Sequence, residues 1–243
     1  MSHRNYINLE EKLLDRPIYR IMPITRLLQL LDEKKLTLVK PKKWDDPFEN
    51  ALLSCEFEIS GEEVASFSAK DGVYGQCWTF HRETDAMWRI YSPDKTGVRV
   101  TTTPRKLLTA LQNSQPTHHH FTCFIGKVSY LYKGDLLEKL QSIDVFNTDG
   151  SGIAESLLYK RIEFRHEREI RLIYSSSENE NPNDVYQFDI EPMELLDRIL
   201  FDPRMDKNLV EAYKLAIAAK GCNTEIRRST LYDAPKGLKF KLA

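Results

Sequence analysis

Acidic and basic side chains are concentrated late in the chain, in the run EFRHEREIR at residues 163–171. If a strand includes Glu167, then Glu167, Glu169 and Arg171 project from the same face, because side chains on one face recur every two residues. Two carboxylates about 7 Å apart can hold a cation, orient the hydroxyl pair of a ribose, or let one acid act as a base. Arg171 can equally lie between acids in a structural ion-pair ladder. The residue types leave both interpretations open.

An arginine lies early in the chain within the otherwise apolar segment 18–22, beside Tyr19. A guanidinium in such a strand can clamp a phosphate or a carboxylate with two parallel hydrogen bonds. The alternative is that Arg20 lies on an edge strand and pairs with a neighbouring acid, since strand faces are commonly half exposed.

Two aromatic segments are further candidates for ligand contacts. Residues 85–91 predict a short helix capped by Thr84, on which Met87, Trp88 and Tyr91 can share a face. Two large aromatic side chains there could stack a nucleobase or a nicotinamide ring, whereas the alternative is ordinary core packing.

Residues 43–49, KWDDPFE, predict a turn in which an aspartate bonds its own backbone two residues on. Trp44 and Phe48 would pin this turn to the core. Asp46 and Trp44 then either wall a ligand pocket or belong to a purely structural turn.

Several other motifs are excluded. On a strand, Cys77 and His81 would lie roughly 13 Å apart, beyond the ~3 Å reach of a nucleophile and its base. The consecutive histidines 118–120 point in alternating directions and make no metal site without partners elsewhere. No C-x-x-C, H-E-x-x-H, P-loop or G-x-G-x-x-G pattern occurs. We therefore expect free thiols and no metal.

The composition limits the class of protein. The 243 residues carry 35 Lys+Arg against 36 Asp+Glu, which argues against bulk electrostatic coating of nucleic acid but allows a local basic patch. No apolar run approaches the roughly 20 residues of a membrane-spanning helix, and the start lacks the apolar core of a signal peptide. We expect a cytoplasmic protein with no membrane contact. Its length fits one domain over 1–243, with a core from about 18 to 233.

The elements that must position these residues are short and mixed. The clearest helices are predicted at 23–35 and 207–220, with shorter ones at 104–111, 136–140, 154–161 and 192–198. Strand-like segments occur at 18–22, 36–40, 51–57, 73–80, 97–103, 121–131, 169–174, 185–190, 199–202 and 224–228. Helices and strands do not alternate regularly, so the pattern predicts an α+β domain with a mixed or mainly antiparallel sheet and flanking helices.

Taken in order, these segments resemble an uncharacterised bacterial family, domain-of-unknown-function family 2971. The resemblance rests on the strings IYRI, KKWDDPFEN, GQCWTF, DAMWRIY with TGVRVTT, KRIEFRHEREIRLIY, ILFDPRMD and RRSTLYD. Together they extend from about Ile18 to Asp233.

The order of these elements is also loosely similar to ADP-ribosyltransferase-type folds. That similarity implies NAD as the bound nucleotide, with Arg20 as a phosphate clamp and Trp44 as a pocket wall. It implies that Trp88 and Tyr91 stack the ring, and that Glu169, with Glu167, is the catalytic carboxylate.

Three functional hypotheses follow. The first is an NAD-dependent ADP-ribosyltransferase-like toxin or antiphage defence effector. The second is a non-catalytic module that binds nucleic acid or protein, and the third is that these segments only build the fold. Convergence of Arg20, Trp88 and Glu169 on one pocket would favour the enzyme.

Overall fold

The fold is taken from a computed structural model. It describes residues 3–60, 63–66, 72–116, 122–145, 147, 150–175, 183–235 and 237. The histidines at 118–120 lie outside the described residues.

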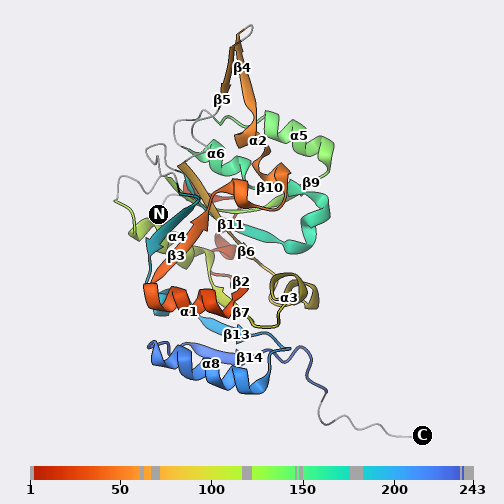
Figure 1. The fold of residues 1–243 in the computed structure, drawn as a ribbon. Coiled ribbons are helices and arrows are strands. Elements are labelled where there is room, and N and C mark those ends of the chain that lie inside the picture. Colours follow the sequence, from red (N-terminus) through yellow and green to blue (C-terminus); the bar gives the residue numbers. More distant parts are fainter. Residues whose placement is uncertain are drawn as a thin grey trace, which may run out of the picture.

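A twisted, branched sheet of ten strands runs through the molecule (Figure 1). Its main path contains, in spatial order, β1 (Tyr6–Ile7), β8 (Cys123–Lys127), β11 (Glu169–Ser175), β6 (Val73–Thr79), β2 (Ile18–Pro23), β7 (Gly97–Thr102), β13 (Arg198–Phe201) and β14 (Glu225–Arg228). A branch leaves β6 through β3 (Lys35–Val39), which pairs with β12 (Val185–Asp189). Most pairs are antiparallel, whereas β1–β8 and β13–β14 are parallel. The predicted mixed, mainly antiparallel α+β fold is confirmed.

Strand β6 is the junction that brings distant parts of the chain together. Thr79, at its end, pairs with Glu169 on β11 and with Tyr19 on β2. A residue near the start of the chain and one late in the chain are thereby placed on either side of the same strand end. This junction positions the candidate site.

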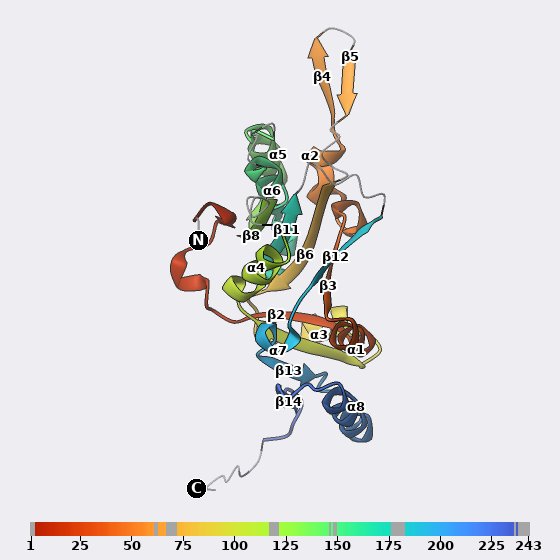
Figure 2. The ribbon, with the colours of Figure 1, turned by 90° about the vertical axis from the view of Figure 1, so that its left-hand side faces the viewer.

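Helices flank the sheet and small strand pairs extend it (Figure 2). The helices are α1 (Ile24–Glu33), α2 (Ala51–Ser54), α3 (Asp85–Tyr91), α4 (Pro104–Asn113), α5 (Lys133–Gln141), α6 (Ser151–Ser156), α7 (Pro192–Leu195) and α8 (Lys207–Ala219). The antiparallel pair β4 (Glu56–Ser60) and β5 (Glu63–Ser66) projects from the end opposite α8, and β9 (Ser129–Leu131) pairs in parallel with β10 (Tyr159–Arg161).

Capping residues account for several helix starts. Thr84, Thr103 and Asp206 each accept a hydrogen bond from a backbone N–H in the first turn, at α3, α4 and α8 respectively. A side-chain oxygen in this position replaces the partner that the first N–H groups of a helix lack. The sequence predicts a helix at each of these three places, and at α3 it also predicts the Thr84 cap.

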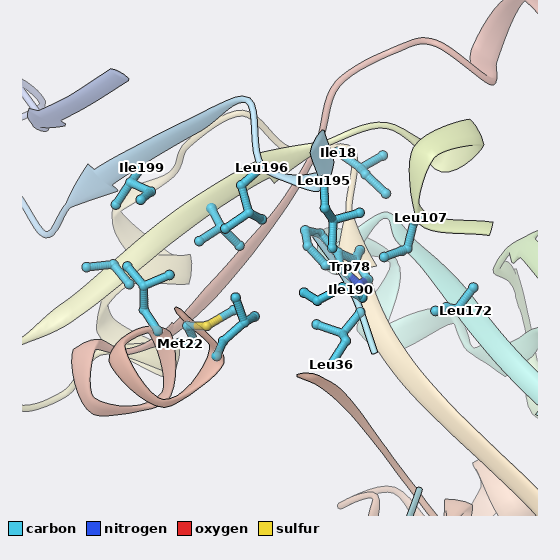
Figure 3. Packing of buried hydrophobic residues seen from close by; sticks show 14 of the residues in the cluster. Ile18, Met22, Leu36, Trp78, Leu107, Leu172, Ile190, Leu195, Leu196 and Ile199 are labelled. Atoms are coloured by element: carbon cyan, nitrogen blue, oxygen red, sulfur yellow. The ribbon is translucent and has the colours of Figure 1, made fainter. Parts of the chain in front are cut away.

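The main core is apolar and lies where β2, β6, β7, β11 and β13 are covered by helices. Ile18, Trp78, Leu107, Leu172 and Ile199 belong to it, with Figure 3 showing how side chains from the different elements interdigitate. Burial of this surface is the main favourable contribution to folding. Within the described residues, no helix combines the length and the apolar composition needed to cross a bilayer.

Several predicted boundaries are wrong. Pro23 ends β2 and precedes the helix as its N-cap, and Lys34 adopts a left-handed conformation (φ 51°) that ends the helix at Glu33, two residues earlier than predicted. Residues 51–54 form a helix instead of a strand, because Asp46 caps the turn that leads into it. The segment predicted as a helix at 154–161 divides into the end of α6 and strand β10.

Candidate functional site

A pocket of about 110 Å³ opens where β2, β6 and α3 meet. Its walls contain residues from the early strand, the junction strand, the aromatic helix and the late acidic segment: Tyr19, Arg20, Ile21, Cys77, Trp78, Thr79, Met87, Tyr91, Glu167 and Glu169. Four parts of the chain that are remote in sequence therefore share one cavity. We refer to it as the carboxylate pocket.

Glu169 is fixed by a fully buried arginine. Arg171, two residues along β11, donates from Nε and Nη2 to Glu169 Oε2 at 2.8 and 2.5 Å. The same Nη2 donates to Glu49 Oε2 at 2.5 Å, and Nη1 donates to the carbonyl of Leu157 at 2.7 Å. Arg171 does not line the pocket, so it acts on any ligand only through the carboxylate that it orients.

A lysine completes this network. Lys160 Nζ lies 2.8 Å from Glu49 Oε1, 2.5 Å from Glu167 Oε2 and 3.3 Å from Glu169 Oε1. Three buried carboxylates and two buried cations thus form one ion-pair cluster, and a buried charge is tolerated only with such partners. The ion pairs that the sequence allows for Arg171 are present, and they lie inside the protein instead of on its surface.

Glu167 reaches the pocket by a different route from the one predicted. It ends a 3-10 helix (Ile162–Glu167), and Arg168 adopts a left-handed conformation (φ 47°) before β11 begins. The Thr79 hydroxyl donates to the Glu167 carbonyl and holds this turn against β6. The prediction that Glu167 and Glu169 project from one face of the same strand is therefore wrong, although both side chains line the pocket.

The two acids differ in ionisation. Burial, followed by repulsion from Glu169, raises the pKa of Glu167 to about 7. Burial also opposes ionisation of Glu169, but Arg171 and Lys160 outweigh it and hold its pKa below the usual range. One carboxylate is therefore charged at neutral pH while its neighbour exchanges a proton there, the division of roles that acid–base chemistry requires.

Arg20 provides the positive side of the pocket. Its Nη1 donates to the Cys77 carbonyl at 2.7 Å, and within the described residues its guanidinium forms no ion pair. Burial lowers its pKa, opposed by Cys77, Tyr91 and Glu169. The predicted edge pairing of Arg20 with an acid does not occur among these residues, so its remaining donors are available to a ligand.

Of the two large aromatic residues of helix α3, one lines the pocket and the other does not. Tyr91 lines the pocket and its hydroxyl donates to Glu167 Oε1 at 3.4 Å. Trp88 is fully buried, and its Nε1 donates to Glu83 Oε1 at 2.8 Å. The prediction that Trp88 stacks a ligand ring is therefore wrong, because its side chain is buried in the protein and does not line the pocket.

The predicted turn at 43–49 is structural. Asp46 accepts from the Phe48 N–H and pairs with Arg161 at 3.0 Å, and it does not line the pocket. The Trp44 ring lies 4.4 Å from the Arg171 guanidinium and packs against Gly75, where a Cβ would approach it to 2.7 Å. Trp44 thus supports the arginine that orients Glu169 and is not a pocket wall.

Cys77 faces the pocket as a neutral thiol. Burial raises its pKa to about 12, with Glu169 adding to the shift. A thiol with such a pKa is a poor nucleophile, which agrees with the exclusion of a Cys77–His81 dyad. Within the described residues no group of three or more His, Cys, Asp or Glu side chains could hold a metal ion.

Two members of the buried cluster were missed. Lys160 and Glu49 stand within motifs that carried the family resemblance, but no spacing indicated that residues 49 and 160 would meet Glu169. Only the pairing of β9 with β10 and the turn at Asp46 bring them together.

A second hollow of about 430 Å³ adjoins the carboxylate pocket. It lies between α1, β3 and β12, and it shares Arg20 and Ile21 with the smaller pocket. Gln29, Thr37 and Gln76 are among the polar residues that line it. Arg20 therefore lies at the boundary between the two spaces.

Comparisons with known proteins give one family and a group of distant structures. Residues 87–172 match the family model described as "Protein of unknown function (DUF2971)", as the sequence resemblance predicted. This region contains Tyr91, Lys160, Glu167 and Glu169. No curated protein matches the chain significantly.

Among solved structures, the chain is similar to DarT of Thermus sp. 2.9. The complex with NAD⁺ matches with a TM-score of 0.41 and 12% identity, covering 88% of this chain and 96% of that chain. The complex with ADP-ribosylated ssDNA matches with a TM-score of 0.42 and 13% identity, covering 88% and 94%. A likeness at this level assigns no function.

Proposed function

We propose that the chain is an NAD-dependent transferase of the ADP-ribosyltransferase type, with Glu169 and Glu167 as its catalytic carboxylates. One observation carries the proposal. Arg20, Tyr91, Glu167 and Glu169 converge on one pocket in which a charged acid, a titrating acid and an unpaired guanidinium face each other.

The sizes of the two hollows support NAD as the donor substrate. The carboxylate pocket, at about 110 Å³, admits a single ring and not a dinucleotide, whereas the adjoining hollow offers about 430 Å³. NAD would place its nicotinamide end beside Tyr91 and Glu169, its pyrophosphate at Arg20 and its adenosine towards α1. Arg20 suits the pyrophosphate because a guanidinium donates to phosphate oxygens in parallel pairs.

Each residue then has a distinct task. Glu169, held ionised by Arg171 and Lys160, accepts a hydrogen bond from a ribose hydroxyl and stabilises positive charge on the anomeric carbon. The bond to the nicotinamide nitrogen breaks, and nicotinamide leaves with the bonding electron pair. The acceptor forms the new bond to that carbon and gives its proton to Glu167, whose pKa of about 7 suits a base near neutral pH.

The first test measures NAD binding by calorimetry and nicotinamide release by chromatography. We expect the wild type to bind NAD and Glu167→Gln to retain binding while nicotinamide release falls at least about 100-fold, the lower end of the range for a lost acid–base residue. Glu163→Gln is the matched control, because Glu163 is an exposed glutamate of the same 3-10 helix. It should behave as the wild type.

Absence of NAD binding at millimolar concentration would reject the proposal. Equal nicotinamide release by Glu167→Gln and the wild type would reject Glu167 as the base. Thermal unfolding of each variant is measured alongside, so that a fall in release is attributed to chemistry only where the fold is retained.

We further propose that the transferase acts on a component of the host cell, as a toxin or antiphage effector. Induced expression should then arrest growth, and Glu167→Gln should relieve the arrest at equal protein level. Growth arrest of the same extent by both forms would dissociate toxicity from the carboxylate pocket.

A further inference from the structure

A second site candidate is a hollow on the other side of the turn that carries the two acids. It measures about 920 Å³. Its walls come from the N-terminal segment, the end of β8 with β9, and the 3-10 helix before β11: Tyr6, Asn8, Leu9, Glu10, Leu13, Arg16, Phe80, Lys127, Val128, Ser129, Tyr130, Arg165 and Arg168. We refer to it as the basic groove.

Four cations surround this groove, and among the described residues only the charge of Lys127 acts on an acid of the lining, Glu10, without forming an ion pair with it. Arg16, Lys127, Arg165 and Arg168 are all exposed, and none forms an ion pair within the described part of the chain. The single acid in the lining, Glu10, is paired with Lys12 at 2.6 Å.

Cations elsewhere on the surface are commonly paired. Arg105, Arg198 and Lys220, for example, each lie within 3 Å of a carboxylate oxygen. The overall charge of the chain is −1, so this unpaired group is a local feature and not a consequence of composition. Such a cluster focuses the field on an anionic ligand.

Planar side chains accompany the charges. The Arg16 guanidinium lies 5.4 Å from the centre of the Phe80 ring, and Tyr130 is half-buried at the groove wall. Guanidinium planes and aromatic rings are surfaces on which unpaired bases stack, while the cations contact phosphates. A concave hollow of this size admits bases of a single strand, which a duplex keeps inside its stack.

The groove and the carboxylate pocket share one structural element. Within the turn Glu167–Arg168–Glu169, the two acids line the pocket and Arg168, with its left-handed backbone, lines the groove. The Phe80 N–H donates to the Arg168 carbonyl, and the Glu169 N–H donates to the Tyr130 hydroxyl at 2.7 Å. The wall of the groove and the two carboxylates thus belong to adjacent residues of one turn.

We propose that the basic groove binds single-stranded nucleic acid and presents it as the acceptor of the transferase. This rests on the proposed function. An N–H or O–H group of the strand would attack the anomeric carbon of the ADP-ribose unit, the carbon–nitrogen bond to nicotinamide would break, and the proton of the acceptor would pass to Glu167. The released nicotinamide keeps the electron pair of the broken bond.

The test measures binding of fluorescein-labelled oligonucleotides by anisotropy, in the absence of NAD. Arg168→Asn is the diagnostic variant, because Asn tolerates the left-handed conformation of residue 168. Lys95→Asn is its matched control, since Lys95 is also exposed, cationic and left-handed (φ 64°) but lies outside the groove.

We expect single-stranded oligonucleotides to bind, and Arg168→Asn to weaken binding about five- to tenfold at low salt. The slope of log affinity against log salt should fall by about 0.7 for the lost phosphate contact. Lys95→Asn should leave both quantities unchanged, and Arg168→Asn should leave NAD affinity unchanged.

Three outcomes would overturn the inference: no oligonucleotide binding, equal binding by Arg168→Asn and the wild type, or a preference for duplex or for an acidic peptide such as polyglutamate. Failure of the proposed function is distinguishable, because it appears as absent NAD binding whatever the oligonucleotide does. Groove-dependent oligonucleotide binding without NAD binding would support the non-catalytic module instead.

Discussion

Two arginines approach the candidate site from neighbouring parts of the sheet, and their surroundings differ. Arg171 is fully buried, and its Nε, Nη1 and Nη2 all donate to protein oxygens. Arg20 is half-buried and donates once, to the Cys77 carbonyl. Acidic side chains neutralise the charge of Arg171, whereas Arg20 forms no ion pair among the residues that the structure describes. The comparison separates an arginine that organises the site from one that can hold a ligand.

The largest expected effect comes from removing the organising arginine. Arg171→Met leaves Glu49 and Glu169 buried with Lys160 as their remaining cation. Removing one partner of a buried ion pair typically costs about 3–5 kcal/mol. Chemical denaturation should show a loss of this size in the free energy of unfolding. A loss below about 1 kcal/mol would mean that the two arginines do not differ as described.

The ligand-binding arginine should give the opposite result. Arg20→Met removes only one hydrogen bond within the protein. It also removes the charged donors that Arg20 offers to a phosphate, and each hydrogen bond from such a donor contributes about 1.5–3 kcal/mol. We expect NAD affinity to fall roughly 10- to 100-fold, with unfolding free energy changed by about 1 kcal/mol or less. Calorimetric titration and denaturation on the same samples measure both. Unchanged NAD affinity would remove Arg20 from the site.

The acids form a similar contrast, which pH can expose. The pKa of Glu167 is about 7 when folded and near 4.5 when unfolded, so the folded state binds more protons between those values. Stability therefore falls as pH rises through this window and levels off above about 7. Glu167→Gln lacks this titration. Relative to the variant, the wild type should lose on the order of 2 kcal/mol between pH 4.5 and 8.

Unfolding measured across this pH range, with Glu163→Gln as the control, checks the prediction. Parallel stability curves for the wild type and Glu167→Gln would show that residue 167 titrates near its ordinary pKa. Glu169 should not contribute in this window, because Arg171 and Lys160 lower its pKa.

Residue types along the sequence predicted most of the elements and part of the site. Segments of β-branched and aromatic residues bounded by turn residues located β2, β6 and β11, and helical patterns located α4 and α8, since these depend on neighbours in sequence. They also selected Tyr19, Arg20, Tyr91, Glu167 and Glu169, all of which line the carboxylate pocket.

The parts of the site that were not predicted correctly depend on contacts between residues far apart in the sequence. Lys160 and Glu49 were missed because only strand pairing and packing bring them to Glu169. Trp88 and Trp44 were assigned to a ligand because an aromatic residue in sequence does not reveal which side of its element is buried. The left-handed turn at Arg168 was likewise not predicted, because no glycine at this position indicates it.

The smallest expected effect on stability and NAD binding tests whether Trp88 and Tyr91 of α3 have different roles. Trp88→Phe keeps the ring in the core but removes the Nε1 donor to Glu83, which then retains the Ser229 hydroxyl as a donor. The loss of one hydrogen bond to a charged group, partly compensated, should lower the unfolding free energy by about 1 kcal/mol. NAD affinity should stay within twofold of the wild type, because Trp88 does not line the pocket. Tyr91→Ala is the partner variant and should weaken NAD binding clearly more than Trp88→Phe does. If Trp88→Phe instead weakened NAD binding as much as Tyr91→Ala, Trp88 would contact the ligand, and α3 would have to move on binding.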